Sequence, residues 1–235
     1  INFFQQSLPI YQELKDRKEE ANVLNNLGNA YYNLGQYEKA INFFQQSLPI
    51  YQELKDRKEE ANVLNNLGNA YYNLGQYEKA INFFQQSLPI YQELKDRKEE
   101  ANVLNNLGNA YYNLGQYEKA INFFQQSLPI YQELKDRKGE AYVLNNLGNA
   151  YDNLGQYERA INFYQQSLAI YQELKHRKGE ARVLCRLGVC YCCLGQHKRK
   201  IDVFQQSLPI FRELKDREGE AIVLNLSRIH ISEPT

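Results

Sequence analysis

The chain has 235 residues, with 28 Lys plus Arg balanced by 28 Asp plus Glu, so its formal net charge is zero. Nucleic acids and anionic membranes attract cationic surfaces, and this balance therefore argues against both as general partners. No apolar run is long enough to predict a signal peptide or a membrane span. All four cysteines lie close together in the sequence, which is not a disulfide framework and indicates a reducing, cytoplasmic compartment.

The sequence repeats with a period of 40 residues, and residues 1–40, 41–80 and 81–120 are identical. Such a period predicts stacked structural units instead of ordinary globular domains. Because the chain lacks Met and begins inside a repeat, we interpret it as an internal fragment of a longer protein. The parts are an orphan second helix at 1–20, complete units at 21–60, 61–100, 101–140, 141–180 and 181–220, and a truncated unit at 221–226.

The first predicted element is a helix over residues 1–15, which has no preceding helix and which we expect to fray. Each complete unit then shows two helical periodicities, with apolar or small residues at steps of three and four. In unit 61–100 the first stripe comprises Ala61, Leu64, Leu67, Gly68, Tyr71 and Leu74, and the second comprises Tyr77, Ala80, Ile81, Phe84, Leu88, Tyr91 and Leu94. Gly75 between them suits a left-handed C-cap, because glycine has no Cβ. The short loop predicts two antiparallel helices.

The junction between units carries signals for a helix start. Asp96 is a predicted N-cap, so the next helix should begin near Arg97, and Glu99 three residues later matches a capping box. Later copies replace this Glu by Gly, which should remove the reciprocal bond at a cost of about 1 kcal/mol or less each. The replaced positions are Gly139, Gly179 and Gly219, and His176 replaces one capping Asp and should weaken that start further. The mixed charges of residues 95–100 predict a solvated outer turn.

A proline recurs well inside each predicted second helix, except in the copy that has Ala169. Proline removes a backbone hydrogen bond and clashes with the preceding turn, so either a kinked helix or a break with a new start is expected. The apolar spacing continues from Phe84 through Leu94 without interruption, which favours the kink. The prolines are Pro9, Pro49, Pro89, Pro129 and Pro209.

Residues 227–235 (SRIHISEPT) match nothing in the repeat. They resemble the translation of a sequencing-library adapter, and we interpret them as an assembly artefact, with a natural C-terminal end as the alternative. Pro234 and the lost periodicity predict a frayed segment.

The pattern of the unit resembles the tetratricopeptide repeat at Leu64, Leu67, Gly68, Tyr71, Gly75, Tyr77, Ala80 and Phe84. In this resemblance Gly68 and Ala80 are the small residues that let two helices approach closely. Ser87 stands where the family usually has Ala, and the family's terminal Pro is missing. The unit is similar to the 40-residue variant found in Pins-type G-protein signalling modulators and in bacterial signalling repeat proteins. The resemblance implies an all-α, right-handed superhelical solenoid of antiparallel helix pairs that binds a protein or peptide.

The resemblance further implies that the first helices line a concave face. Helical spacing places five polar positions of each unit on one face, away from the Leu stripe. The candidate peptide-binding residues are Asn22, Asn25, Asn29, Tyr32, Asn33, Asn62, Asn65, Asn69, Tyr72, Asn73, Asn102, Asn105, Asn109, Tyr112, Asn113, Asn145, Asn149 and Asn153. In unit 141–180, Tyr142 and Asp152 occupy the two remaining positions.

Asparagine suits such a face because its amide offers both a donor and an acceptor to a peptide backbone. Tyrosine adds contact area and a hydroxyl at low entropic cost. A ladder of these side chains is therefore expected to hold an extended chain with little demand on its sequence. The alternative is that the asparagines only solvate an exposed face. Carboxylate-clamp variants of the family carry Lys at the position of Asn65, so the Asn argues against capture of a C-terminal carboxylate.

The fifth unit loses the asparagine pattern, and we interpret its changes as ordinary divergence, which centres the expected binding face on the first four repeats. The replacing residues are Arg182, Cys185, Arg186, Val189, Cys192 and Cys193. Cys and His197 match no tetrahedral zinc spacing, so no metal is expected. No Ser/His/Asp or Cys/His set and no glycine-rich phosphate loop is present, so we predict neither catalysis nor a cofactor.

Two functional alternatives stay open beside a peptide-binding scaffold. One is a structural array that associates with itself through exposed helix faces. The other is a regulatory arm of a multidomain signalling protein. RNA reading by helical repeats is disfavoured because the face lacks rows of Lys and Arg.

Overall fold

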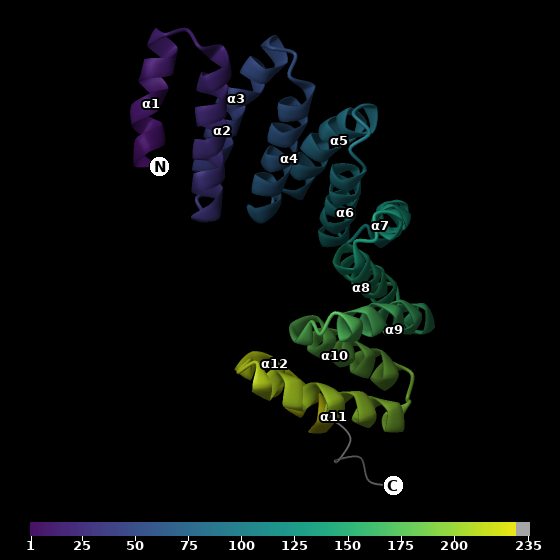
Figure 1. The fold of residues 1–235 in the computed structure, drawn as a ribbon. Helices are drawn as coiled ribbons and strands as arrows, with labels where there is room; N and C mark the ends of the chain where they lie inside the picture. Colours follow the sequence, from purple (N-terminus) through teal and green to yellow (C-terminus); the bar gives the residue numbers. More distant parts are fainter. Residues whose placement is uncertain (229–235) are drawn as a thin grey trace. The chain divides into compact units, whose positions relative to one another are not determined.

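The computed structural model describes residues 1–228, and this part of the chain consists of helices and short connections without any strand (Figure 1). The helices are α1 (Asn2–Glu13), α2 (Arg17–Asn33), α3 (Tyr37–Glu53), α4 (Arg57–Asn73), α5 (Tyr77–Glu93), α6 (Arg97–Asn113), α7 (Tyr117–Glu133), α8 (Arg137–Asn153), α9 (Tyr157–Glu173), α10 (Arg177–Cys193), α11 (His197–Glu213) and α12 (Arg217–Arg228). The chain forms two compact units, residues 1–123 and the part that begins at residue 124. In each unit consecutive helices pack side by side. The predicted all-α architecture of repeated helix pairs is confirmed.

The connections between helices explain why successive helices are neighbours. Only residues 74–76 separate α4 from α5, and Gly75 adopts a left-handed conformation with φ 73°. At the next junction the carboxylate of Asp96 accepts a hydrogen bond of 3.2 Å from the backbone N–H of Glu99, and α6 begins at Arg97. The predicted glycine cap and the predicted helix start are therefore both confirmed.

A second left-handed residue, which the sequence did not reveal, closes each second helix. Lys95 has a φ of 55°, and its five counterparts adopt the same conformation. This geometry lets the N–H of Asp96 donate to the carbonyl of Tyr91 at 2.9 Å, as in a Schellman motif. The left-handed conformation is sterically unfavourable for lysine because of its Cβ atom, and glycine lacks this atom.

The capping-box prediction is wrong in its reciprocal half. The N–H of Asp96 already donates to Tyr91, so the Glu99 side chain has no backbone donor to accept from. Glu99 Oε2 instead accepts from Asn102 Nδ2 at 3.2 Å. His176 also caps its helix, since its Nδ1 accepts a hydrogen bond from Gly179 N–H at 3.0 Å, and whether it caps more weakly than Asp stays a prediction.

The outer turn is not uniformly solvated, in contrast to the prediction. Glu60 is only 8% exposed, and Arg57 Nη1 lies 2.6 Å from its Oε2. Gln52 of the preceding helix donates to the other carboxylate oxygen at 3.2 Å, and Arg57 also reaches Glu93 of the following helix at 3.2 Å. This network joins three consecutive helices, which sequence spacing alone cannot indicate.

The core of each pair follows the two predicted stripes. Ala61, Leu64, Ala80 and Phe84 are almost completely buried in one cluster of the first unit. A Cβ atom added to Gly68 would lie 2.4 Å from the Phe84 ring, so only glycine permits this approach of α4 and α5. The predicted role of Gly68 as a contact point between helices is confirmed.

The recurring proline does not divide the second helix. Helix α5 runs without interruption from Tyr77 to Glu93 with Pro89 inside it. Of the two expected outcomes, the continuous helix is the one observed.

Helix α12 continues through Arg228, and residues 229–235 of the predicted tail lie outside the described residues. Over the described range, no helix combines the length and apolar character that a bilayer crossing requires.

Candidate functional site

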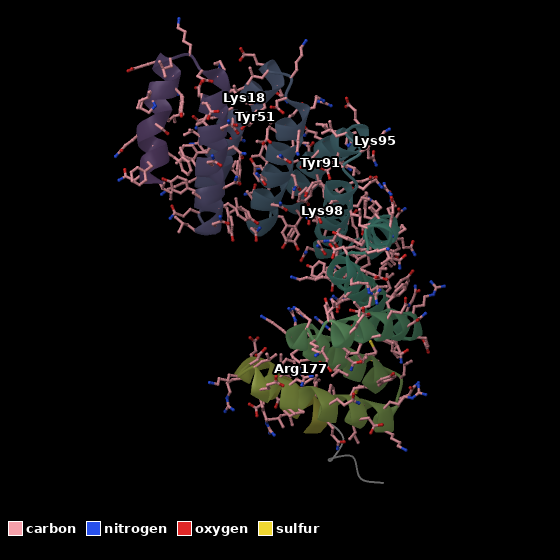
Figure 2. The ribbon with its side chains drawn as sticks, in the orientation of Figure 1. Lys18, Tyr51, Tyr91, Lys95, Lys98 and Arg177 are labelled. Atoms are coloured by element: carbon pink, nitrogen blue, oxygen red, sulfur yellow. The ribbon has the colours of Figure 1, made fainter. Side chains whose placement is uncertain are left out.

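The first candidate positions of units 21–60 and 61–100 lie between the two helices of the pair. Buried Tyr51 of α3 donates through its hydroxyl to Oδ1 of Asn22 on α2 at 2.8 Å, and Tyr91 of α5 makes the same bond to Asn62 at 2.9 Å (Figure 2 labels both tyrosines). Burial raises the pKa of both phenols, so they remain donors over the ordinary pH range. These asparagines therefore hold the second helix in place.

A second set of hydrogen bonds joins successive first helices. Asn66 Nδ2 on α4 donates to Asn29 Oδ1 on α2 at 3.2 Å. One repeat later, Asn106 Nδ2 on α6 donates to Asn69 Oδ1 at 3.2 Å and to Asn65 Oδ1 at 3.5 Å. We call these bonds the asparagine ladder. Its donors, at positions 66 and 106, were absent from the predicted site, and the signal that could have found them is the doubled Asn in each NN pair.

The ends of α4 and α6 repeat this arrangement with tyrosine as acceptor. Asn73 Nδ2 donates to Tyr32 Oη at 2.8 Å and to the carbonyl of Asn69 at 2.8 Å. The Tyr32 ring meets Tyr37 edge to face at 5.4 Å, and burial raises the pKa of Tyr32. The hydroxyl at this end of the face is thus fixed in position.

The structure brings the predicted residues of α2, α4 and α6 together on one face of the first unit. Most of them are half-buried, whereas Asn33, Asn73 and Asn113 are exposed. Asn29 and Asn69 use Oδ1 in the ladder, while their Nδ2 atoms form no hydrogen bond among the described residues. The face therefore retains amide donors whose orientation is set by a neighbouring helix.

The second unit carries the remaining candidates on α8, and there the ladder changes. Asn149 Oδ1 accepts from Tyr164 Oη at 2.7 Å. The donor position of the next helix is Arg186, an exposed residue without a hydrogen bond or salt bridge to any described residue. A cleft of about 290 Å³ lies between α8 and α10, and Asn145, Asn149 and Arg186 line it.

The cysteines of the fifth repeat are free thiols that range from buried Cys190 to exposed Cys193. Cys190 is fully buried, and its Sγ lies 3.6 Å from Asp152 Oδ1. Burial is the main cause that raises the pKa of both Cys190 and Cys185, which keeps these thiols protonated. The described residues contain no group of three or more His, Cys, Asp or Glu side chains arranged to hold a metal ion.

These observations define an all-α tandem-repeat protein whose polar first-helix face is ordered by bonds between repeats. The chain belongs to the tetratricopeptide repeat family, whose model matches residues 1–53, 19–93, 59–133, 99–173 and 139–213. A comparison with curated proteins gave no match.

Solved structures share the fold. BtubC (BKLC) from P. vanneervenii is 21% identical with a TM-score of 0.79, and the match covers 91% of this chain and 90% of that chain. The apo form of RapI is 19% identical with a TM-score of 0.86, and this chain (97% of it matched) spans 65% of RapI. The Rap conjugation gene regulator of plasmid pLS20, solved in complex with the Phr* peptide, is 18% identical over 94% of this chain and 60% of that chain, with a TM-score of 0.67.

Proposed function

We propose that the chain is a protein–protein interaction scaffold that binds an extended or helical segment on its first-helix face. The observation that carries this proposal is the hydrogen bonding of the side-chain amides of Asn29 and Asn69. Each amide oxygen is held by the next helix, and each Nδ2 donor stays unused. Amide donors that are already oriented lose little entropy when they bind a peptide carbonyl, which favours binding.

The family and one structural neighbour support the same function. The tetratricopeptide repeat fold is typical of protein–protein interaction. The pLS20 Rap regulator was solved with a peptide bound. Because the first three repeats are identical in sequence, the face offers the same groups several times and suits a ligand with a regular backbone over one with a unique side-chain order.

The test replaces only the proposed donors. In the variant N29D/N69D, Asp keeps the oxygen that accepts from Asn66 and Asn106 and loses the Nδ2 hydrogens. Peptides selected from a random dodecapeptide library against the unaltered chain should bind this variant about tenfold more weakly or worse, as expected for two lost hydrogen bonds. The matched control is N42D/N82D, which introduces the same charge on the exposed side of α3 and α5. Equal losses in both variants, or no loss in either, would contradict the proposal.

Self-association is a second candidate because α1 exposes an apolar face. Phe3 is 86% exposed, Ile10 is 55% exposed and Leu14 is 68% exposed. Exposed apolar surface of this kind promotes contact between copies. Light scattering over a hundredfold range of concentration tests it: a mass that rises with concentration, and that F3E/I10E abolishes, supports self-association, whereas a constant monomer mass excludes it.

A further inference from the structure

The cleft between α8 and α10 carries arginine at two positions where α2, α4 and α6 carry asparagine. Its α10 wall carries Lys178, Arg182 and Arg186, which follow one another at steps of four residues and so share one face of the helix. Its α8 wall carries neutral polar side chains, among them Asn145 and Asn149. No Asp or Glu lines the cleft. The wall of α10 is thus a row of positive charge facing amides.

The three cations of this row are not neutralised by ion pairs. Lys178, Arg182 and Arg186 are exposed, and none of them forms a hydrogen bond or salt bridge with the described residues. Arg177 on the same helix is different, since it contacts Glu180 at 2.6 Å and Glu213 at 3.0 Å. On helix α10, Arg177 therefore forms ion pairs that connect helices, whereas the three cations of the row form none with the described residues.

One acidic group interacts with the row, and it acts on one of the three cations. Asp152 on α8 interacts with Arg186, but burial outweighs this attraction and raises the Asp152 pKa. Arg182 interacts with Tyr171, whose phenol is uncharged at neutral pH and whose pKa is raised further by burial. His176 and Tyr142 also line the cleft, and His176 accepts the cap bond through Nδ1. At least two of the three charges are left for a ligand.

The asparagine ladder is interrupted at this cleft. In the first unit, Asn66 bridges α4 to α2 through Asn29. Arg186 occupies the equivalent donor position on α10 and makes no such bond, while Asn149 turns its oxygen to Tyr164. Relative to the repeat, Arg182 and Arg186 replace two asparagines and bring two guanidinium groups to the cleft, and Tyr164 replaces the phenylalanine and engages Asn149.

We propose that this cleft binds the acidic side chains of a partner peptide, an inference that rests on the proposed function of the first-helix face. Guanidinium groups bind carboxylates through paired, charge-assisted hydrogen bonds, and Asn145 supplies a neutral amide beside them. The volume of about 290 Å³ is just below the range of small-molecule pockets, so it suits one or two side chains of a longer segment. The occupant is thus an Asp- or Glu-containing peptide.

The experiment starts from peptides selected on the full chain from a random dodecapeptide library, with blocked termini so that only side chains carry charge. We expect Asp and Glu to be enriched among the binders. Fluorescence anisotropy should show a loss of about tenfold for each neutralised arginine in R182Q/R186Q, and a comparable loss when the acidic residues become Gln or Asn. The control K198Q/R199Q removes the same charge from α11 outside this cleft and should leave affinity unchanged.

A charge swap separates recognition from a structural effect. Peptides with Glu replaced by Lys should bind R182E/R186E and not the unaltered chain. Binders that lack acidic enrichment and ignore R182Q/R186Q, but are lost in N29D/N69D, would overturn this inference and keep the proposed function. A library that yields no binder would overturn both. A phosphopeptide or a single-stranded RNA that binds the cleft more tightly than the Glu peptide would overturn the assignment to carboxylates.

Discussion

Asn66 donates a hydrogen bond to Asn29 across two successive first helices, from Nδ2 to Oδ1 at 3.2 Å. The two residues lie 37 positions apart, and the bond connects α4 with α2 directly. Polar side chains on a candidate binding face thus also hold the repeats in register. Their two roles are compatible because each amide has a donor end and an acceptor end.

The ladder should contribute measurably to stability. Asn66→Ala should lower the free energy of unfolding by about 1 kcal/mol, the usual net value of one hydrogen bond. Asn26→Ala is the matched control, since Asn26 occupies the same repeat position, is exposed, and makes no hydrogen bond to the described residues. Urea unfolding measures both. Equal effects of the two substitutions would show that the ladder bond contributes nothing.

The left-handed lysines predict a stabilising substitution. Lys95 has a φ of 55°, so Lys95→Gly should raise the free energy of unfolding by about 1 kcal/mol, because the steric cost of the side chain disappears (Figure 2 labels Lys95 and Lys98). Lys98→Gly, three residues later inside α6, should have the opposite effect and cost about 1 kcal/mol. The same sign for both would refute the conformational explanation. Thermal unfolding of the two variants and the unaltered chain, at the same protein concentration, measures both effects.

Tyrosine burial predicts a loss of stability at alkaline pH. The pKa values of Tyr51 and Tyr91 are raised in the folded chain, so above about pH 10 the unfolded chain releases phenolic protons that the folded chain keeps. Their contribution is fully present below about pH 10 and is lost as the pH rises, by up to about 1.4 kcal/mol per pH unit for each tyrosine. Urea unfolding at several pH values measures this slope.

The control for this pH effect is Tyr51→Phe/Tyr91→Phe. It removes the two hydroxyls that donate to Asn22 and Asn62, which lowers stability at neutral pH. The slope above about pH 10 should nevertheless be shallower than in the unaltered chain. An unchanged slope would assign the alkaline effect to other groups.

The contrast between what sequence predicted and what it missed has a physical basis. Gly75 and Asp96 were predicted correctly because their roles depend on local backbone geometry within a few residues. The burial of Glu60 and the donor role of Asn66 depend on a side chain of another helix, eight residues away in one case and 37 in the other. Periodicity shows which face a residue occupies, but it does not show the neighbour across that face.

The candidate site shows the same limit. The shared face of α2, α4 and α6 was predictable from spacing, and the bonds that already engage its amides were not. Arg182 and Arg186 were interpreted as divergence because each was compared with the Asn that it replaces. Their significance appears only with the cleft that they line, where Asn149 accepts from Tyr164 and not from a neighbouring first helix.

His176 links stability to ligand binding in a way that one substitution tests. Its neutral Nδ1 caps α10, its ring stacks on Tyr171 at 5.1 Å, and it lines the cleft beside Arg182. His176→Asp should raise the free energy of unfolding by about 0.5 kcal/mol, because Asp and Asn are among the preferred helix N-caps and His is not. The same charge next to Arg182 should weaken the binding of acidic peptides by about fivefold.

The expected gain in stability and loss of peptide affinity distinguish the capping role of position 176 from a role in binding. His176→Asn keeps a capping oxygen without adding charge, so it should match Asp in helix capping and leave peptide affinity near that of the unaltered chain. Calorimetric unfolding and peptide anisotropy on the same three proteins give both readouts. If Asp and Asn weaken peptide binding equally, the loss comes from the missing imidazole and its stacking on Tyr171. If only Asp does so, the cleft responds to charge, as a site for acidic side chains requires.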